Sequence, residues 1–253
     1  MLSKTSYFNA TLFRRNLTRF WPLWGLASFI GALFPLAVLL DMVHRGWHSF
    51  SGPEFTQMYY NAVSAVPVIS LVYAALCAMA VWGYLHNTRS VGLMHTLPIR
   101  REGLFLTNFL SGLTMTLIPY AVTGILCVVV SLCGGAFDAR GLAVTVLAVL
   151  GESFFYFSSA TFVAFITGNV FAMPPLYALL HFLAVLLDWL ISSFAQGFIF
   201  GFSTHYTGVA EWLSPTVYLV SRVHPDGQYA EVQRTLADGT SYTDSVLTAV
   251  DLE

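Results

Sequence analysis

Residues 59–85 read YYNAVSAVPVISLVYAALCAMAVWGYL, a run that contains no charged side chain. Its apolar residues fall on every face of the segment rather than at alternate positions, which argues against a strand of a membrane β-barrel. A hydrocarbon core about 30 Å thick is crossed by roughly 20 residues of α-helix. The stretch therefore predicts a membrane-spanning helix.

Four further runs have the same character, and the composition agrees with them. The five predicted spans are residues 21–40, 59–85, 104–132, 142–166 and 176–202. Of the 253 residues, 57% are hydrophobic and 9% charged, whereas about a quarter of the residues in a soluble domain are charged. These observations predict an all-α polytopic membrane protein. The net charge of −2 is too close to neutral to indicate a nucleic-acid partner.

The basic residues are distributed unevenly between the two sides of the membrane. Loops on the cytoplasmic side carry an excess of Lys and Arg. Seven of the eleven such residues precede span one or lie between spans two and three, namely Lys4, Arg14, Arg15, Arg19, Arg89, Arg100 and Arg101. We therefore expect a multi-pass protein with a cytoplasmic N-terminus and with the acidic segment 203–253 outside the cell.

Residues 1–20 have the pattern of an amphipathic helix. Phe8, Leu12 and Leu17 gather on one half of a helical wheel, and basic residues gather on the other. Such a helix lies in the plane of the membrane interface, where Arg14, Arg15 and Arg19 anchor at lipid phosphates. The alternative is a charged flank that only fixes the topology.

The segment 88–102 joins spans two and three, and we call it the elbow. Thr88 or Ser90 can cap a short helix, and Pro98 ends it because the residue before a proline is pushed out of the α region. The apolar surface between these residues is too short to cross a membrane. The elbow is either a helix that fits a groove on a soluble partner or an ordinary loop that obeys the positive-inside rule.

A resemblance favours the first interpretation. The sequence HTLPIRREGLFLTNFLSG, residues 95–112, resembles the ABC-2 type exporter permeases, in particular the six-span permeases of bacterial antibiotic- and peptide-resistance systems. In that family a Leu-Pro-Ile/Val-basic-basic motif follows a short coupling helix that docks on the ATP-binding subunit. The amphipathic N-terminus and the EWLSPTVYL stretch, residues 211–219, are similar to the family's connecting helix and to its extracellular Ser-Pro turn.

The resemblance implies a function and a set of partners. The chain would be the permease subunit of an ATP-driven exporter in a bacterial cell membrane, moving an amphipathic compound or peptide. Its partners would be an ATP-binding subunit dimer, a second permease chain that is identical or homologous, and membrane lipids. The candidate coupling surface consists of Leu93, Met94, Leu97, Pro98, Ile99 and Arg100.

The chain departs from the family after the fifth span. No sixth apolar run follows Tyr218, and Asp226-Gly227 and Asp238-Gly239 are turn signals. We expect a piece of a longer permease with an external domain inserted before the last span; the alternative is a five-span variant.

ATP hydrolysis is not expected in this chain. A P-loop needs a lysine that follows a glycine-rich turn, and the one lysine, Lys4, has no glycine near it. The chain is therefore not expected to be an enzyme or to hold a cofactor, and ATP and Mg²⁺ are expected on a partner subunit.

Two acidic residues and a histidine lie within the predicted spans. Glu152 and Asp188 fall near the middle of spans four and five, and His181 lies about two helical turns before Asp188. Because a charge at the bilayer centre costs at least about 2.5–3.5 kcal/mol, each acid is protonated, paired with another chain or exposed to a water-filled route. The three residues would line a translocation route or fix helix packing, and the family resemblance would place Asp188 at a permease dimer interface.

Two alternatives from other functional classes remain. In an intramembrane enzyme, Glu152, His181 and Asp188 would act as metal ligands or as acid and base groups, but neither H-E-x-x-H nor G-x-S-x-G occurs, and no metal site is expected. In a structural or sensory subunit, the same residues would have no part in transport.

Overall fold

The computed structural model describes residues 8–45, 52–87, 90, 92, 100–135, 137, 139–200, 209–222, 225–235 and 241–252. The helices are α1 (Ala10–Arg19), α2 (Trp21–Arg45), α3 (Gly52–Trp82), α5 (Arg101–Cys133), α6 (Ala139–Ile166), α7 (Met173–Phe198), α8 (Val209–Trp212) and α9 (Pro215–Arg222). Short 3₁₀ turns, η1 (Gly83–His86) and η2 (Val170–Ala172), follow α3 and precede α7. Two strands, β1 (Pro225–Thr235) and β2 (Ser241–Leu252), come last.

Helices α2, α3, α5, α6 and α7 are each long and apolar enough to cross a membrane. Five helices of this kind were expected, and the chain has the character of a helical multi-pass membrane protein. Helix α3 begins at Gly52 rather than at residue 59. Pro53 and Glu54 explain the earlier start, because proline fits the first turn of a helix and a carboxylate there favours the helix dipole.

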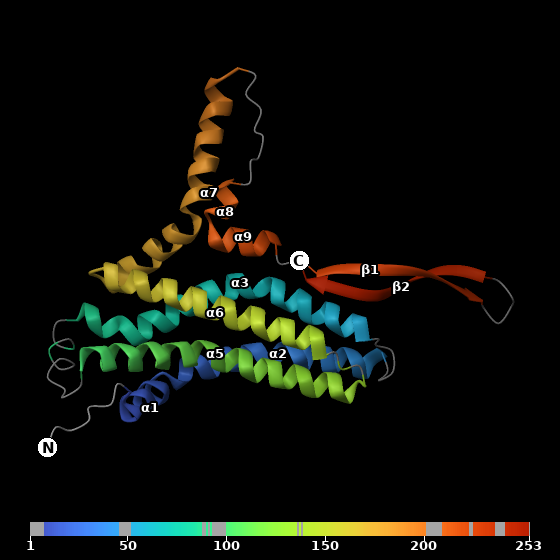
Figure 1. Cartoon of the computed structure of the whole chain (residues 1–253), viewed down its shortest axis with the longest axis horizontal. Coiled ribbons are helices and arrows are strands. Elements are labelled where there is room, and N and C mark those ends of the chain that lie inside the picture. The colour runs from blue at the N-terminus through green and yellow to red at the C-terminus, as the bar shows by residue number, and fades with distance from the viewer. Residues whose placement is uncertain are drawn as a thin grey trace.

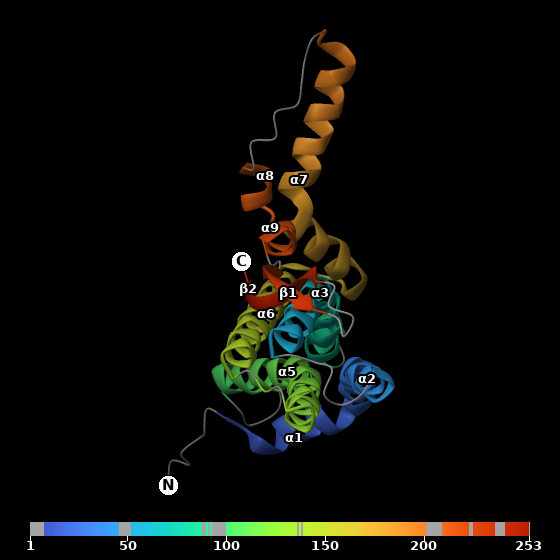
Figure 2. The ribbon, with the colours of Figure 1, turned by 90° about the vertical axis from the view of Figure 1, so that its right-hand side faces the viewer.

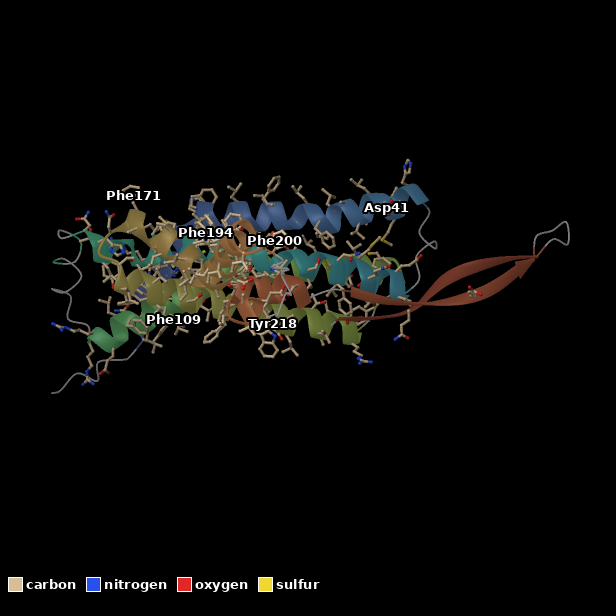
Figure 3. The ribbon with its side chains drawn as sticks, turned by 90° about the horizontal axis from the view of Figure 1, so that it is seen from above. Asp41, Phe109, Phe171, Phe194, Phe200 and Tyr218 are labelled. Atoms are coloured by element: carbon tan, nitrogen blue, oxygen red, sulfur yellow. The ribbon has the colours of Figure 1, made fainter. Side chains whose placement is uncertain are left out.

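Helices α2, α3, α5 and α6 lie side by side as a bundle (Figure 1). The most extensive packing is between α3 and α6 and between α2 and α5. We call the end of the bundle that carries Asn87 and Arg100 the elbow end, and the end from which β1 and β2 extend the hairpin end. Figure 3 places Phe171 at the elbow end and Asp41 at the hairpin end, and Figure 2 shows α1 lying across α5 and α2.

Helix α7 starts beside the bundle and then projects away from it (Figures 1 and 2). Halfway along it, the backbone N–H of Val185 donates to Ser214 Oγ at 3.1 Å. A side chain that inserts into the i→i−4 ladder is a known cause of a helix bend. Helix α9 follows Ser214 and packs against both α7 and α3.

Strands β1 and β2 form an antiparallel hairpin with a register from Pro225 opposite Leu252 to Thr235 opposite Ser241. The predicted turn at Asp226-Gly227 is wrong, because both residues pair within β1. The neighbouring sequence is rich in Tyr, Thr and Val, whose preference for strands prevails over one Asp-Gly pair. The other predicted turn, Asp238-Gly239, lies outside the described residues. The all-α prediction therefore holds for the membrane part, to which the hairpin is an addition.

Candidate functional site

A row of polar side chains follows one face of α6 inside the bundle. Glu152, Tyr156 and Ser159 succeed one another at intervals of four and three residues, which places them on the same face of the helix. Glu152 is only 6% exposed and Tyr156 is fully buried. The row thus brings a carboxyl group and two hydroxyl groups into an otherwise apolar interior.

His181 of α7 joins this row to α9. Its two ring nitrogens lie 3.2 Å from Ser159 Oγ and 3.1 Å from Thr216 Oγ1. The ring is 1% exposed and packs against Tyr156 and Tyr177 at centroid distances of 5.3 and 4.7 Å. Because both nitrogens have hydroxyl partners, His181 fixes α6, α7 and α9 to one another.

The Ser-Pro turn before α9 has a definite structural role. Pro215 occupies the first position of α9, which suits its fixed φ, and the carbonyl of Ser214 accepts from Tyr218 N–H at 2.9 Å. Ser214 and Thr216 are both buried. We expected all of residues 203–253 outside the membrane part, but this portion packs against α7. Its small hydroxyl side chains satisfy groups of α7, which draws the segment inward.

Several buried polar atoms of α6 have no hydrogen-bond partner among the residues that the structure describes. Glu152 Oε2 and Tyr156 Oη belong to the row, and Ser153 Oγ and Ser158 Oγ belong to neighbouring residues of the same helix. Glu152 lies within electrostatic reach of Tyr120 on α5 and of Tyr156. Buried polar groups in proteins are nearly always paired, so the row has hydrogen-bonding capacity that the described fold does not use.

The structure brings together two of the three intramembrane residues that the sequence singled out. Glu152 and His181 share the polar row through Tyr156, whereas Asp188 is half-buried further along α7. No hydrogen bond or ion pair joins Asp188 to Glu152 in the described part of the chain. Helix α7 changes direction between His181 and Asp188 (Figure 1), which an argument from depth in the sequence could not reveal. The described residues also contain no group of three His, Cys, Asp or Glu side chains that could hold a metal ion.

The sequence did not point to two residues of the polar row, Tyr156 and Ser159, or to Thr216, which bonds to His181. A signal for the first two was present, because they follow Glu152 at helical spacing. The sequence held no such signal for Thr216, since this residue lies beyond the fifth span in a segment that was expected to be solvated.

A second polar network lies at the elbow end and connects α1 to α5. The backbone N–H of Asn9, the N-cap of α1, donates to Thr107 Oγ1 at 3.1 Å. Asn16 Nδ2 donates to Asn108 Oδ1 at 2.8 Å and to Ser111 Oγ at 3.0 Å.

The same network reaches the end of α3. Asn108 Nδ2 donates to Tyr84 Oη of η1 at 3.3 Å, and Asn108 itself is buried. The Asn108 side chain of α5 therefore bonds to both α1 and η1. It connects the element just before the elbow, η1, with the helix just after it, α5.

The predicted coupling residues Leu93, Met94, Leu97, Pro98 and Ile99 lie outside the described residues. Arg100 is exposed and extended, with φ −62° and ψ 142°, and immediately precedes α5. Glu102 occupies the first turn of α5, where a carboxylate favours the helix dipole.

The amphipathic character of α1 is visible in the exposure of its side chains. Arg14, Arg15 and Arg19 are exposed, while Leu12 is buried. The predicted placement of α1 in a membrane interface remains a prediction.

Comparisons of the chain with protein-family models, with curated protein sequences and with solved structures found no match. Its function must therefore be argued from its own residues and geometry.

Proposed function

We propose that the chain is the transmembrane permease subunit of an ABC-2 type exporter, which works with a separate ATPase dimer and a second permease chain in a bacterial cell membrane. The observation that carries the proposal is the hydrogen-bonded unit of α1, η1 and α5. This unit flanks the elbow, and the elbow contains the Leu-Pro-Ile-Arg-Arg motif of residues 97–101. A coupling segment must be firmly connected to the helices next to it. Otherwise a force that the partner subunit applies to the segment would move only a loop.

The helices adjoining the elbow suit the transmission of a displacement. Helix α5 runs without interruption from Arg101 to Cys133. Helix α3 has its most extensive packing with α6, and Trp82 at its elbow end donates to Thr161 Oγ1 of α6 at 3.1 Å. Because packed interiors are dense and hardly compressible, movement of the elbow is passed through α3 and α5 to α6, which carries Glu152.

The orientation follows from the basic residues. Arg14, Arg15 and Arg19 of α1, together with Arg100 and Arg101, lie at the elbow end, and positive residues mark the cytoplasmic side. We therefore assign the elbow end to the cytoplasm, where the ATPase would supply ATP and Mg²⁺, and the β1–β2 hairpin to the outside.

The polar row and α7 receive separate roles. The unused hydrogen-bonding capacity at Glu152 suits a route for cationic or amphipathic compounds. The projecting part of α7 exposes Leu186, Trp189 and Phe194 and carries Asp188. We assign that part to contact with the second permease chain, by analogy with the family that the elbow resembles.

Co-purification tests the proposal. The full chain is isolated in mild detergent from the cells that produce it, bound proteins are identified by mass spectrometry, and ATP hydrolysis by the complex is measured. We expect a P-loop ATPase with the wild type and its loss from a Leu93→Asp, Leu97→Asp, Arg100→Glu variant.

Arg140→Glu is the control, because it reverses an exposed positive charge near the hairpin end of the bundle. This variant should retain the ATPase. Absence of any ATPase from the wild type, or equal retention by the elbow variant, would contradict the proposal.

A further inference from the structure

A cavity of about 550 Å³ is lined by α3, α5 and α6, together with Phe34 of α2, in the half of the bundle toward the hairpin end. Its volume falls within the range of roughly 300–1,000 Å³ that is typical of small-molecule sites. The lining is almost wholly apolar and includes Val63, Leu117, Val128, Val149 and Leu150. Glu152, Tyr156 and Ser159 do not line it, although the lining residue Tyr120 lies within electrostatic reach of Glu152.

The hydroxyl groups among the lining residues are already engaged. Tyr59 Oη donates to the carbonyl of Cys127 at 2.8 Å, and Tyr120 Oη lies 2.6 Å from Ser70 Oγ. Two lining threonines donate to carbonyls of their own helices, Thr123 to that of Pro119 and Thr145 to that of Gly141. Because these hydroxyl groups are already in hydrogen bonds, what they can still offer a ligand is chiefly acceptor lone pairs. A polar ligand group would lose its hydration and gain few hydrogen bonds in exchange, so the cavity favours an apolar occupant.

The cavity faces the hydrocarbon of the membrane between α5 and α6. Three of its lining residues lie on the lipid-facing surface of these helices: Ile125 is 64% exposed, and Val146 and Leu150 are also exposed. Toward the elbow end the same two helices are closed by the contact of Phe157 with Phe109 and Gly112. The separation of α5 and α6 is thus confined to one leaflet.

We propose that this cavity binds an alkyl chain of a membrane lipid, which enters sideways between α5 and α6 from the leaflet at the hairpin end. An acyl chain is the one apolar group that is present at high concentration along that face. An alkyl chain that moves from lipid into the cavity does not leave water, so its gain in free energy comes chiefly from close packing. The occupant is therefore retained by shape. The proposal does not rest on transport, and it holds for either orientation of the chain.

Gly124 offers a way to fill the cavity from within. It lines the cavity, and a Cβ added there meets nothing within 4 Å. Gly124→Leu therefore occupies the space without a clash at Cβ. Gly151 of α6 is the matched control, because a Cβ there also meets nothing within 4 Å and Gly151 does not line the cavity.

The experiment places the full chain in vesicles of phosphatidylcholine and phosphatidylglycerol that contain a small fraction of phosphatidylcholine with a photoactivatable diazirine on its acyl chain. Labelled residues are mapped by peptide mass spectrometry. In the wild type we expect labels within residues 120–128 and 142–150. Gly124→Leu should lower this labelling by about tenfold, equivalent to ~1.4 kcal/mol of affinity. Labelling of the exposed Leu33 and Leu36 on α2 should stay constant.

Gly151→Leu should label as the wild type does, and Ala121→Phe, which also fills the cavity, should behave as Gly124→Leu. Circular dichroism and gel filtration identify any variant that fails to fold, in which case the other cavity-filling variant decides. Equal labelling of the wild type and both cavity-filling variants would overturn the proposal, because the label would then report only surrounding lipid. An equal loss in Gly151→Leu would overturn it as well.

Discussion

The two halves of the α5–α6 pair are built differently, although the same two helices form both. Toward the elbow end, Phe157 of α6 lies directly against Gly112 of α5, and aromatic rings fill the neighbouring space. The rings of Trp82, Phe105, Phe109 and Phe165 form a connected group with centroid distances of 4.9 to 5.9 Å. Toward the hairpin end, the helices separate around a cavity of about 550 Å³.

This difference indicates how one helix pair can be both rigid and adaptable. A dense interior resists compression and transmits displacement, whereas a cavity can change its volume when its occupant leaves. We infer that the elbow half is the mechanically firm part and that the hairpin half can rearrange. Substitutions that should affect the two halves unequally test this contrast.

Trp82→Ala should have the largest effect on stability. Trp82 is buried, lies 5.4 Å from Phe105 and 4.9 Å from Phe165 between ring centroids, and donates to Thr161. Loss of such a side chain from a core typically lowers the free energy of unfolding by about 3–5 kcal/mol. The measurement is an equilibrium SDS titration in mixed micelles. Trp189→Ala is the control, because Trp189 is 66% exposed on α7 and its loss should change stability by about 0.5 kcal/mol. Equal losses of stability in Trp82→Ala and Trp189→Ala would refute the inference that the elbow half is the firm part of the bundle.

Gly112→Leu and Gly124→Leu compare the two halves of α5 with the same substitution. A Cβ at Gly112 overlaps the ring of Phe157, and overpacking of this kind costs about 1–3 kcal/mol. At Gly124 there is open space, so leucine should leave stability unchanged or raise it by up to about 1 kcal/mol through helix propensity. The same SDS titration measures the free energy of unfolding of both variants. A larger loss in Gly124→Leu than in Gly112→Leu would contradict the inferred difference between the two halves.

Asn108→Leu should release α1 from the bundle. The substitution removes the hydrogen bonds to Asn16 and Tyr84, and loss of one partner of a buried polar pair costs about 1–3 kcal/mol. Hydrogen–deuterium exchange of the α1 amides should accelerate because local opening becomes easier. Thr18→Val is the control, since Thr18 is exposed and its hydroxyl donates to the Arg14 and Arg15 carbonyls of its own helix. Unchanged exchange in Asn108→Leu would show that the other contacts of α1, including its hydrogen bonds with Thr107 and Ser111, hold it without Asn108.

The spans could be predicted because length and apolarity are properties of each segment by itself. All five helices were expected. Within the candidate site, Glu152 was expected to be inside the membrane part, where it is indeed buried. A local pattern was sufficient in each case.

Features that depend on how distant segments meet could not be predicted. The bond between His181 and Thr216 requires α9 to return to α7, and nothing in the local sequence of either helix specifies that return. The contact of Asn16 with Asn108 spans 92 residues. The cavity arises from the spacing between α5 and α6, which no single stretch of sequence encodes.

Glu152→Gln should have the smallest effect on stability, although its position is the one where a change is most expected to alter function. Glutamine has nearly the shape of glutamate, and Glu152 Oε2 has no hydrogen-bond partner among the described residues. The free energy of unfolding should therefore change by less than about 1 kcal/mol. Asp188→Asn, at a half-buried carboxyl on α7, is the matched control and should also be nearly neutral.

If Glu152→Gln instead lowers the free energy of unfolding by about 3–5 kcal/mol, as does the removal of one member of a buried ion pair, then a cation from outside the described residues pairs with Glu152. A neutral effect on stability together with loss of transport would mean that the carboxyl contributes to function and not to the fold. The unused hydrogen-bonding capacity of the polar row would then belong to the translocation route. A buried group that neither stabilises the fold nor pairs within it is available to bind the transported compound.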